Sequence, residues 1–396
     1  MSPRPYFYLS LLIVAICFDK TRAQNIVESN STNLTANPVT LTGRDASEFF
    51  FSAADFKKAA LNVSKDDPLL RKLNAHVAEL VEGAPWMPLH HTLGISGYET
   101  YFDHPDEYFY ALSIAVPFLS TELAEKTRGL LGGMAVETPP FAKDGLDRRA
   151  GRARESYDVP VELRRAGRGG ASNLFGVYAW WSYCSYANRK PSVGVRELPP
   201  LPESPYKFNI QSAGSGKDEA EKLNGDLAGL IGFIRLARAG RDRDAEEKAE
   251  KKFQELLELR INLERVNPRI LEKTFSASKS LHNCKLARYC DLTPEIGAAV
   301  GKWSSGCGPG HLKAFREERN GWYLAFGDRM IGGENYTNPL HFSRALFAGA
   351  TFIEELPGGQ LAPFLDVPWC KADLYFIEKC VYALWAKAGR PWIELK

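Results

Sequence analysis

The stretch from Trp322 to Phe347 gathers side chains that can move protons and bind polar ligands. An aromatic run leads into glycines at positions 327, 332 and 333, and a polar cluster follows them. Pro339 then suits the first position of a helix, where its missing N–H would have no helical partner in any case. Loops held in place by rigid helices often carry catalytic and binding residues. The alternative is a polar connection whose glycines only turn the chain. The cluster consists of Asp328, Arg329, Glu334, Asn335, Tyr336, Asn338 and His341.

Carboxylates in and near this stretch suggest glycosidic chemistry, in which paired carboxylates supply the acid and either the base or the nucleophile. Glu334 follows Gly333, and a glycine lets a ligand approach the backbone closely. Asp226 follows an Asn-Gly pair at the predicted start of an apolar-striped helix, where it can instead be a charge that favours the helix dipole. Asp328 beside Arg329 can instead form a plain ion pair. The predicted catalytic residues are Glu334, Asp226, Asp328 and His341.

Flat aromatic rings and imidazoles at loop or helix-end positions could contact sugar rings. The alternative for most of these aromatic residues is packing in the core. Trp180 and Trp181 are adjacent and point to different helix faces, so at most one of them can line a cleft. The predicted substrate-binding residues are Trp86, His90, His91, Tyr98, Trp180, Trp181, Trp322, Arg329, Asn335 and Tyr336.

Elimination is the alternative to hydrolysis, and it needs a different set of groups. The carboxylate of a uronate must be neutralised, and a base must remove the adjacent proton. The base could be His90, His91, His341 or Tyr336. Arg329, together with Asn335 and Glu334, could neutralise the uronate carboxylate. Seven arginines between positions 148 and 168 would attract an anionic polymer, or would simply form a solvated loop.

The first residues of the chain have the pattern of a secretory signal. Arg4 gives the positive start, Tyr6 to Cys17 is the apolar run, and Ala23 is the small residue at the cleavage site. The apolar run is too short to span a bilayer as a helix, although charges after it leave a retained anchor as the alternative. We predict residues 1–23 as a signal peptide, 24–45 as a flexible N-terminus and 46–396 as one domain of a secreted or periplasmic protein.

The composition excludes several classes of protein. The chain is 44% hydrophobic and 12% aromatic, which is enough for a large core and argues against disorder. The net charge is +2, and the signal itself contributes Arg4, Lys20 and Arg22 against Asp19, so the remaining chain is near neutral. We therefore expect no nucleic-acid partner, and no stable membrane span after the signal is cleaved.

Seven cysteines are present, and Cys17 belongs to the signal, which leaves six. An even number in an exported chain permits disulfides, with Cys284 and Cys290 as the nearest pair, and buried free thiols are the alternative. The chain has no phosphate-binding loop, dinucleotide fingerprint, nucleophile elbow or zinc motif. We expect neither a cofactor nor a metal.

Helical periodicity dominates the sequence, and hydrophobic alternation at period two is nearly absent, so we predict no strand. The clearest element is a helical hairpin. Leu223, Leu227, Leu230, Ile231 and Ile234 stripe its first arm, Gly240 to Asp244 turn the chain, and Phe253, Leu256, Leu257 and Ile261 stripe the second arm up to Asn267-Pro268. Other helical segments are predicted from Ser47 to Glu82, from Pro105, from Ser120 to Gly132-Gly133, from Phe175, from Thr293-Pro294, after Pro339, and from about Pro368 to Gly389.

An all-α chain of helical hairpins with long loops resembles the (α/α) toroid enzymes that act on polysaccharides. The resemblance covers about residues 50–390, and it includes Trp-Trp-x-Tyr at 180–183, Asn-Gly-Asp at 224–226 and Gly-Gly-Glu-Asn-Tyr at 332–336. It carries over no catalytic residue. It implies a polysaccharide or oligosaccharide substrate, cleaved by a glycoside hydrolase or, alternatively, by a polysaccharide lyase. The alternative from another class is a non-catalytic glycan-binding or scaffold protein.

Overall fold

The computed structural model describes part of the chain, mainly its helices. The described residues are 41–42, 48–51, 60, 62–83, 90–92, 97–99, 105–137, 139–141, 174–187, 194–203, 215–266, 289, 293, 295–296, 374–388 and 393–395. The predicted signal peptide, the arginine-rich segment 148–168 and the polar cluster at 327–341 lie outside these residues.

Four helices form the centre of the structure: α4 (Pro105–Ala115), α7 (Phe175–Tyr186), α8 (Ser215–Gly240) and α15 (Leu374–Lys387). Every residue of α7 is buried, and so is the length of α8 from Leu223 to Ala237. A helix that is apolar on all sides must be covered on all sides. This explains why the sequence of α7, with two tryptophans and three tyrosines, shows no clean amphipathic stripe.

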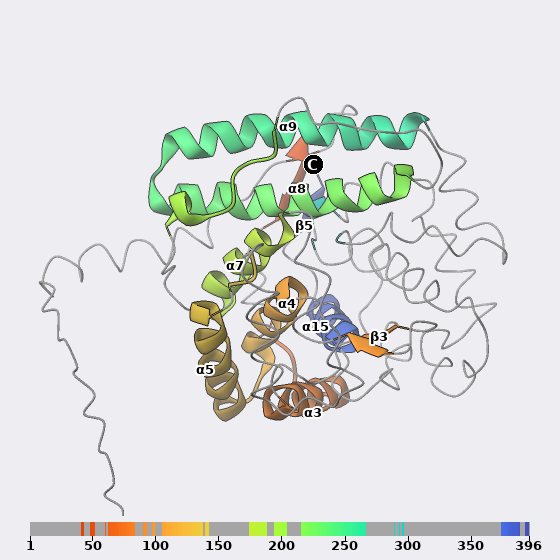
Figure 1. Ribbon diagram of the computed structural model, residues 1–396. Helices are drawn as coiled ribbons and strands as arrows, with labels where there is room; N and C mark the ends of the chain where they lie inside the picture. Colours follow the sequence, from red (N-terminus) through yellow and green to blue (C-terminus); the bar gives the residue numbers. More distant parts are fainter. Residues whose placement is uncertain are drawn as a thin grey trace, which may run out of the picture.

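The helices pack in a row, in the order α9, α8, α7, α4, α15 and α3, with each contacting the next. Figure 1 shows α8 and α9 (Arg243–Val266) side by side at one end, and α3 (Pro68–Gly83) with α5 (Thr121–Glu137) at the other. The outer helices α3 and α9 are amphipathic. In α3, Leu69, Leu73, Val77 and Leu80 form the buried face, as the spacing predicts.

The predicted helical hairpin is confirmed, with arms of 26 and 24 residues. Arg241 takes a left-handed conformation, with φ of 58°, in the turn between α8 and α9. The backbone N–H of Asp242 reaches back to the carbonyl of Ala237 at 3.0 Å, which satisfies one of the last carbonyls of α8. The side chain of Asp242 then caps α9, because its Oδ1 accepts from the N–H of Ala245 at 3.1 Å.

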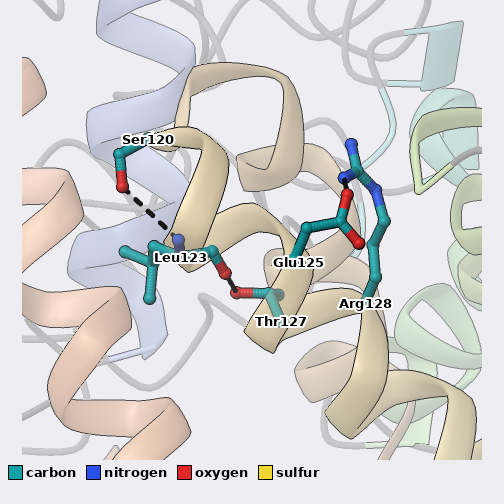
Figure 2. Close-up of polar contacts among 5 residues, drawn as sticks. All are labelled: Ser120, Leu123, Glu125, Thr127 and Arg128. Atoms are coloured by element: carbon teal, nitrogen blue, oxygen red, sulfur yellow. Dashed lines mark hydrogen bonds and ion pairs between the residues drawn. The ribbon is translucent and has the colours of Figure 1, made fainter.

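Helix α5 begins where the sequence predicts, but it ends later. Ser120 Oγ accepts from the N–H of Leu123, and Figure 2 shows this cap together with Thr127 and the Glu125–Arg128 ion pair. The predicted stop at Gly132-Gly133 is wrong, since the helix continues to Glu137. A mid-helix glycine costs only about 1 kcal/mol relative to alanine, which packing of Leu131 and Met134 into the core can offset.

The expectation of no strand is wrong in detail, because the described residues contain short strands. Strands β1 (Leu41–Thr42), β2 (Glu48–Phe51) and β5 (Ile393–Leu395) form one antiparallel sheet in the order β1-β2-β5. The predicted helix from Ser47 therefore does not start there. Phe49 pairs with Leu395, so the sheet joins the two ends of the described chain. Runs of two to four residues are too short for period-two alternation to show.

Helices dominate the described residues, which confirms the all-α class. The predicted last helix is confirmed as α15, and the remaining short elements are η2 (Val116–Phe118), η4 (Val195–Glu197), β3 (His90–Thr92) and β4 (Gly97–Glu99). Residues of one central stack thus come from positions 105 to 387, which brings together side chains that are far apart in the sequence.

Candidate functional site

Eight of the predicted site residues lie outside the described part of the chain: Trp86, Trp322, Asp328, Arg329, Glu334, Asn335, Tyr336 and His341. The six residues that the structure describes lie on three elements. His90, His91 and Tyr98 belong to the β3–β4 hairpin, Trp180 and Trp181 to α7, and Asp226 to α8.

The β3–β4 hairpin carries His90, His91 and Tyr98. The antiparallel register sets His91 opposite Tyr98 and His90 opposite Glu99. Directly opposed residues in an antiparallel pair lie within about 5.5 Å at their Cα atoms. Two histidines, a tyrosine and a glutamate therefore lie within the six residues of this short hairpin.

Trp180 and Trp181 lie in the core, and both are 0% exposed. Trp180 packs against Phe141 and Tyr183, with ring centroids 5.5 and 5.4 Å apart. Trp181 packs against Tyr178, and the guanidinium carbon of Arg235 lies 4.1 Å from the centre of its ring. In this arrangement the two rings fill the helical core, and neither presents a face to solvent.

Asp226 is 3% exposed and lies within α8 rather than at its start. Its Oδ1 accepts from the backbone N–H of Leu174 at 2.9 Å, and Leu174 is the residue that precedes α7. The first N–H groups of a helix have no partner within that helix. Asp226 thus binds the beginning of the neighbouring helix, a role that its own helix position would not suggest.

Sequence reasoning missed a group of buried polar contacts between α7, α8 and Glu295. Arg235 of α8 forms an ion pair with Glu295, with 2.5 Å between Nη2 and Oε1, and the two side chains are 2% and 0% exposed. Tyr178 of α7 donates its hydroxyl to Glu295 Oε2 at 3.0 Å. We call Tyr178, Trp181, Arg235 and Glu295 the core polar cluster.

The chemistry of this cluster depends on the protonation state of Tyr178 and of Tyr186, whose ring packs against Trp181. Burial, and then the negative charge of Glu295, hold the pKa of Tyr178 well above its usual value. Burial also raises the pKa of Tyr186, where Arg235 acts in the opposite direction and Glu295 in the same one. Both hydroxyls therefore stay protonated at neutral pH. They can donate hydrogen bonds, but they cannot serve as bases.

A second tyrosine contact lies beside the cluster. The hydroxyls of Tyr110 on α4 and Tyr382 on α15 form a hydrogen bond, and burial, followed by the electrostatic effect of Tyr382, raises the pKa of Tyr110. Tyr110 also packs against Tyr178, with ring centroids 5.8 Å apart. Ring packing between Tyr110 and Tyr178 thus connects the hydrogen bond between α4 and α15 to the core polar cluster.

Nucleophilic and metal chemistry gain no candidate from the described residues. Cys184 and Cys380 are both buried thiols, and burial raises the pKa of the Cys184 thiol, which keeps it in its unreactive protonated form. The described residues contain no group of three or more metal-ligating side chains. The proposed Cys284–Cys290 disulfide lies outside them.

One sequence signal pointed toward the cluster. Arg235 follows directly after the apolar stripe of α8, where a charge inside a buried helix implies a buried partner. Nothing in the sequence indicates that this partner lies sixty positions further on, because ion pairing between distant residues leaves no local pattern.

No family model, curated protein or solved structure matches this chain. Within the described part, no helix is long and apolar enough to cross a membrane.

Proposed function

We propose that this protein is an exported enzyme that cleaves a polysaccharide or oligosaccharide, and that it acts as a glycoside hydrolase. The observation that carries the proposal is the glycine-rich polar cluster at 327–338 in a helical chain that begins with a signal-like segment. The helical class of the described residues supports it, because the (α/α) toroid enzymes that the sequence resembles are built from helices. We also propose that the row of helices continues into a closed (α/α) toroid.

Asp226 is the weakest member of the predicted carboxylate set, since it already binds the N–H of Leu174 inside the core. The proposal therefore rests on Glu334 and Asp328 as the pair. In this scheme one carboxylic acid protonates the glycosidic oxygen, and the other carboxylate activates water or attacks the sugar directly.

A polysaccharide lyase is the second candidate, and the β3–β4 hairpin is the observation that favours it. The register there sets His91 opposite Tyr98 and His90 opposite Glu99, so two possible bases lie on one short hairpin. Tyr178 is unsuited to this role because its raised pKa keeps it protonated. Within the lyase scheme, His90 and His91 are the candidate bases in the described part of the chain, and His341 and Tyr336 remain candidates outside it.

Incubation of the purified protein with a panel of neutral and acidic glycans distinguishes these reactions. Hydrolysis yields new reducing ends without new ultraviolet absorbance, whereas elimination yields an absorbing double bond at each cut. Binding without either product would identify a glycan-binding or scaffold protein instead.

The residue test compares Glu334→Gln with Glu122→Gln as a matched control. Glu122 is an exposed helix carboxylate paired with Lys126 at 2.8 Å, so its loss should leave turnover unchanged. Glu334→Gln should reduce turnover by at least about 10²-fold, as expected for the loss of general acid–base catalysis. Equal turnover in the two variants would remove Glu334 from the mechanism.

A further inference from the structure

The turn that precedes α3 exposes an asparagine and a serine two positions apart. Residues 62–67 turn the chain directly before α3 begins at Pro68. Asn62 and Ser64 are exposed there, whereas Val63 between them is partly buried and packs against the hydrophobic core. The packing of Val63 thus keeps the two outer residues of the tripeptide Asn62-Val63-Ser64 at the surface.

Backbone contacts on both sides hold this turn in place. The N–H of Val63 donates to the carbonyl of Ala60 at 3.4 Å, and the N–H of Asp67 donates to the carbonyl of Ser64 at 3.1 Å. The hydroxyl of Ser64 accepts a hydrogen bond from the N–H of Asp66 at 3.3 Å. A serine hydroxyl that accepts one hydrogen bond still has its own proton to donate. The turn therefore presents a hydroxyl that retains hydrogen-bonding capacity beside an exposed amide.

The tripeptide matches the acceptor pattern for N-linked glycosylation, which is Asn-x-Ser or Asn-x-Thr with any residue except proline in the middle. The chain contains this pattern at Asn30, Asn33, Asn62 and Asn335, and of these only Asn62 lies in the part of the chain that the structure describes. An attached oligosaccharide is bulky and hydrophilic, so a folded protein can hold it only at its surface. The exposure of Asn62 and Ser64 meets this requirement.

We propose that Asn62 is a site of N-linked glycosylation, presented on the turn before α3. Its side-chain amide nitrogen attacks the anomeric carbon of an oligosaccharide that is carried on a lipid pyrophosphate, in a reaction that an oligosaccharyl transferase of the exporting cell catalyses. The new nitrogen–carbon bond replaces the carbon–oxygen bond to the pyrophosphate. The lipid pyrophosphate leaves, and the amide nitrogen gives up one proton to a base of the transferase. The proposal rests on the export that the proposed function includes, and it does not depend on cleavage of a glycan by this protein.

Expression of the full chain in a eukaryotic secretory cell tests the proposal. One form keeps its own residues 1–23, and in a second form an established secretory signal replaces them. Enzymatic release of the glycan in heavy-oxygen water converts a glycosylated asparagine into labelled aspartate, which peptide mass spectrometry locates. We expect the label at Asn62 in both forms.

Three variants separate the acceptor tripeptide from its surroundings. Ser64→Ala removes the hydroxyl and should abolish the label, although Asn62 itself is unchanged. Ser64→Thr keeps a hydroxyl and should retain the label. Lys65→Ala is the matched control, because Lys65 is exposed next to the tripeptide without belonging to it, and it should leave the label unchanged.

Release of the glycan from the folded protein tests the structural part of the proposal. Because Asn62 is exposed on a turn, the glycosidase should remove the glycan without prior denaturation. For the same reason, Asn62→Gln should unfold at the same temperature as the wild type. A glycan that is released only after denaturation would contradict the exposed position of Asn62.

The proposal fails if chain recovered from the secretory pathway with the replaced signal carries unmodified Asn62. It also fails if Ser64→Ala keeps the label, since the modification would then not require the tripeptide. A label with the replaced signal but not with residues 1–23 would refute export, and with it the proposed function, while Asn62 would remain an acceptor. If Asn62 is labelled and no glycan is cleaved by the purified protein, only the enzyme assignment fails.

Discussion

Lys387 at the end of α15 donates a hydrogen bond to Asp67 at the start of α3, with 2.7 Å between Nζ and Oδ2. Asp67 also caps its own helix, because Oδ1 accepts from the N–H of Leu69 at 2.8 Å. One carboxylate therefore satisfies a helix N-terminus and ties together two helices that are 320 positions apart in sequence.

This pair makes stability depend on pH in a defined window. Partial burial acts to raise the pKa of Asp67, but the Lys387 hydrogen bond and the backbone N–H groups outweigh it, so the pKa falls below its ordinary value of 3.8. A carboxyl with a lowered pKa in the folded state stabilises the fold above its unfolded pKa, and this contribution is lost as pH falls through the folded pKa. Because the pair is partly exposed, its contribution at neutral pH should be at most about 1 kcal/mol.

We predict that Asp67→Asn, which keeps a capping oxygen, is less stable than the wild type at pH 7 and equally stable below the pKa of Asp67. Urea unfolding at several pH values from 7 to 2.5 would measure the free energy of unfolding of both proteins. Lys387→Met should remove the part of this pH dependence that comes from the Lys387 hydrogen bond, and the part that comes from the backbone N–H groups should remain. If the free energies of unfolding of the wild type and Asp67→Asn changed with pH in the same way, the Asp67–Lys387 pair would not contribute to the pH dependence of stability.

Close packing of α7 on α8 predicts opposite effects for two glycine substitutions. A Cβ on Gly229 would lie 2.1 Å from the carbonyl oxygen of Leu174, whereas a Cβ on Gly133 in α5 meets nothing within 4 Å. Gly229→Ala should therefore destabilise by more than about 2 kcal/mol through overpacking. Gly133→Ala should stabilise by up to about 1 kcal/mol through helix propensity. Thermal unfolding of both variants checks the prediction. Equal shifts in unfolding temperature would contradict the close approach of Leu174 to Gly229.

The buried position of Asp226 predicts a loss of stability when its side chain is removed. Asp226→Ala leaves the N–H of Leu174 without its acceptor and should cost about 1–3 kcal/mol of unfolding free energy. Asp226→Asn keeps an oxygen acceptor and should cost less. Unfolding in urea measures both free energies. If Asp226→Asn instead abolished turnover at full stability, Asp226 would be catalytic.

Burial of Cys184 predicts slow alkylation of its thiol in the folded protein. The thiolate is the reactive form, and the raised pKa of Cys184 keeps it scarce, while the side chain is only 4% exposed. Iodoacetamide labelling followed by peptide mass spectrometry should therefore modify Cys184 in urea and leave it unmodified in buffer at pH 8. Fast labelling in buffer would mean that α7 opens locally.

Several elements were predictable from sequence because their causes are local. The stripes of α8 and α9, the turn at Gly240 to Asp244 and the Ser120 cap depend on residues within a few positions of one another. The same local reasoning failed at Gly132-Gly133, where packing overrides a weak propensity, and at β2, whose partner β5 lies at the other end of the described chain. Strand pairing of this kind depends on contacts that no window of sequence contains.

The sequence by itself determined the all-α class, the helical hairpin and the set of residues capable of acid–base chemistry. Only the tertiary structure decided what several of those residues do. Trp181 lies under Arg235, Asp226 binds the start of a neighbouring helix, and Glu295 joins α7 to α8. The physical reason is that residue type sets which interactions a side chain can make, whereas burial and partners set which of them it does make. Partners here lie 52 to 117 positions away along the chain, as in the Leu174–Asp226 and Tyr178–Glu295 hydrogen bonds.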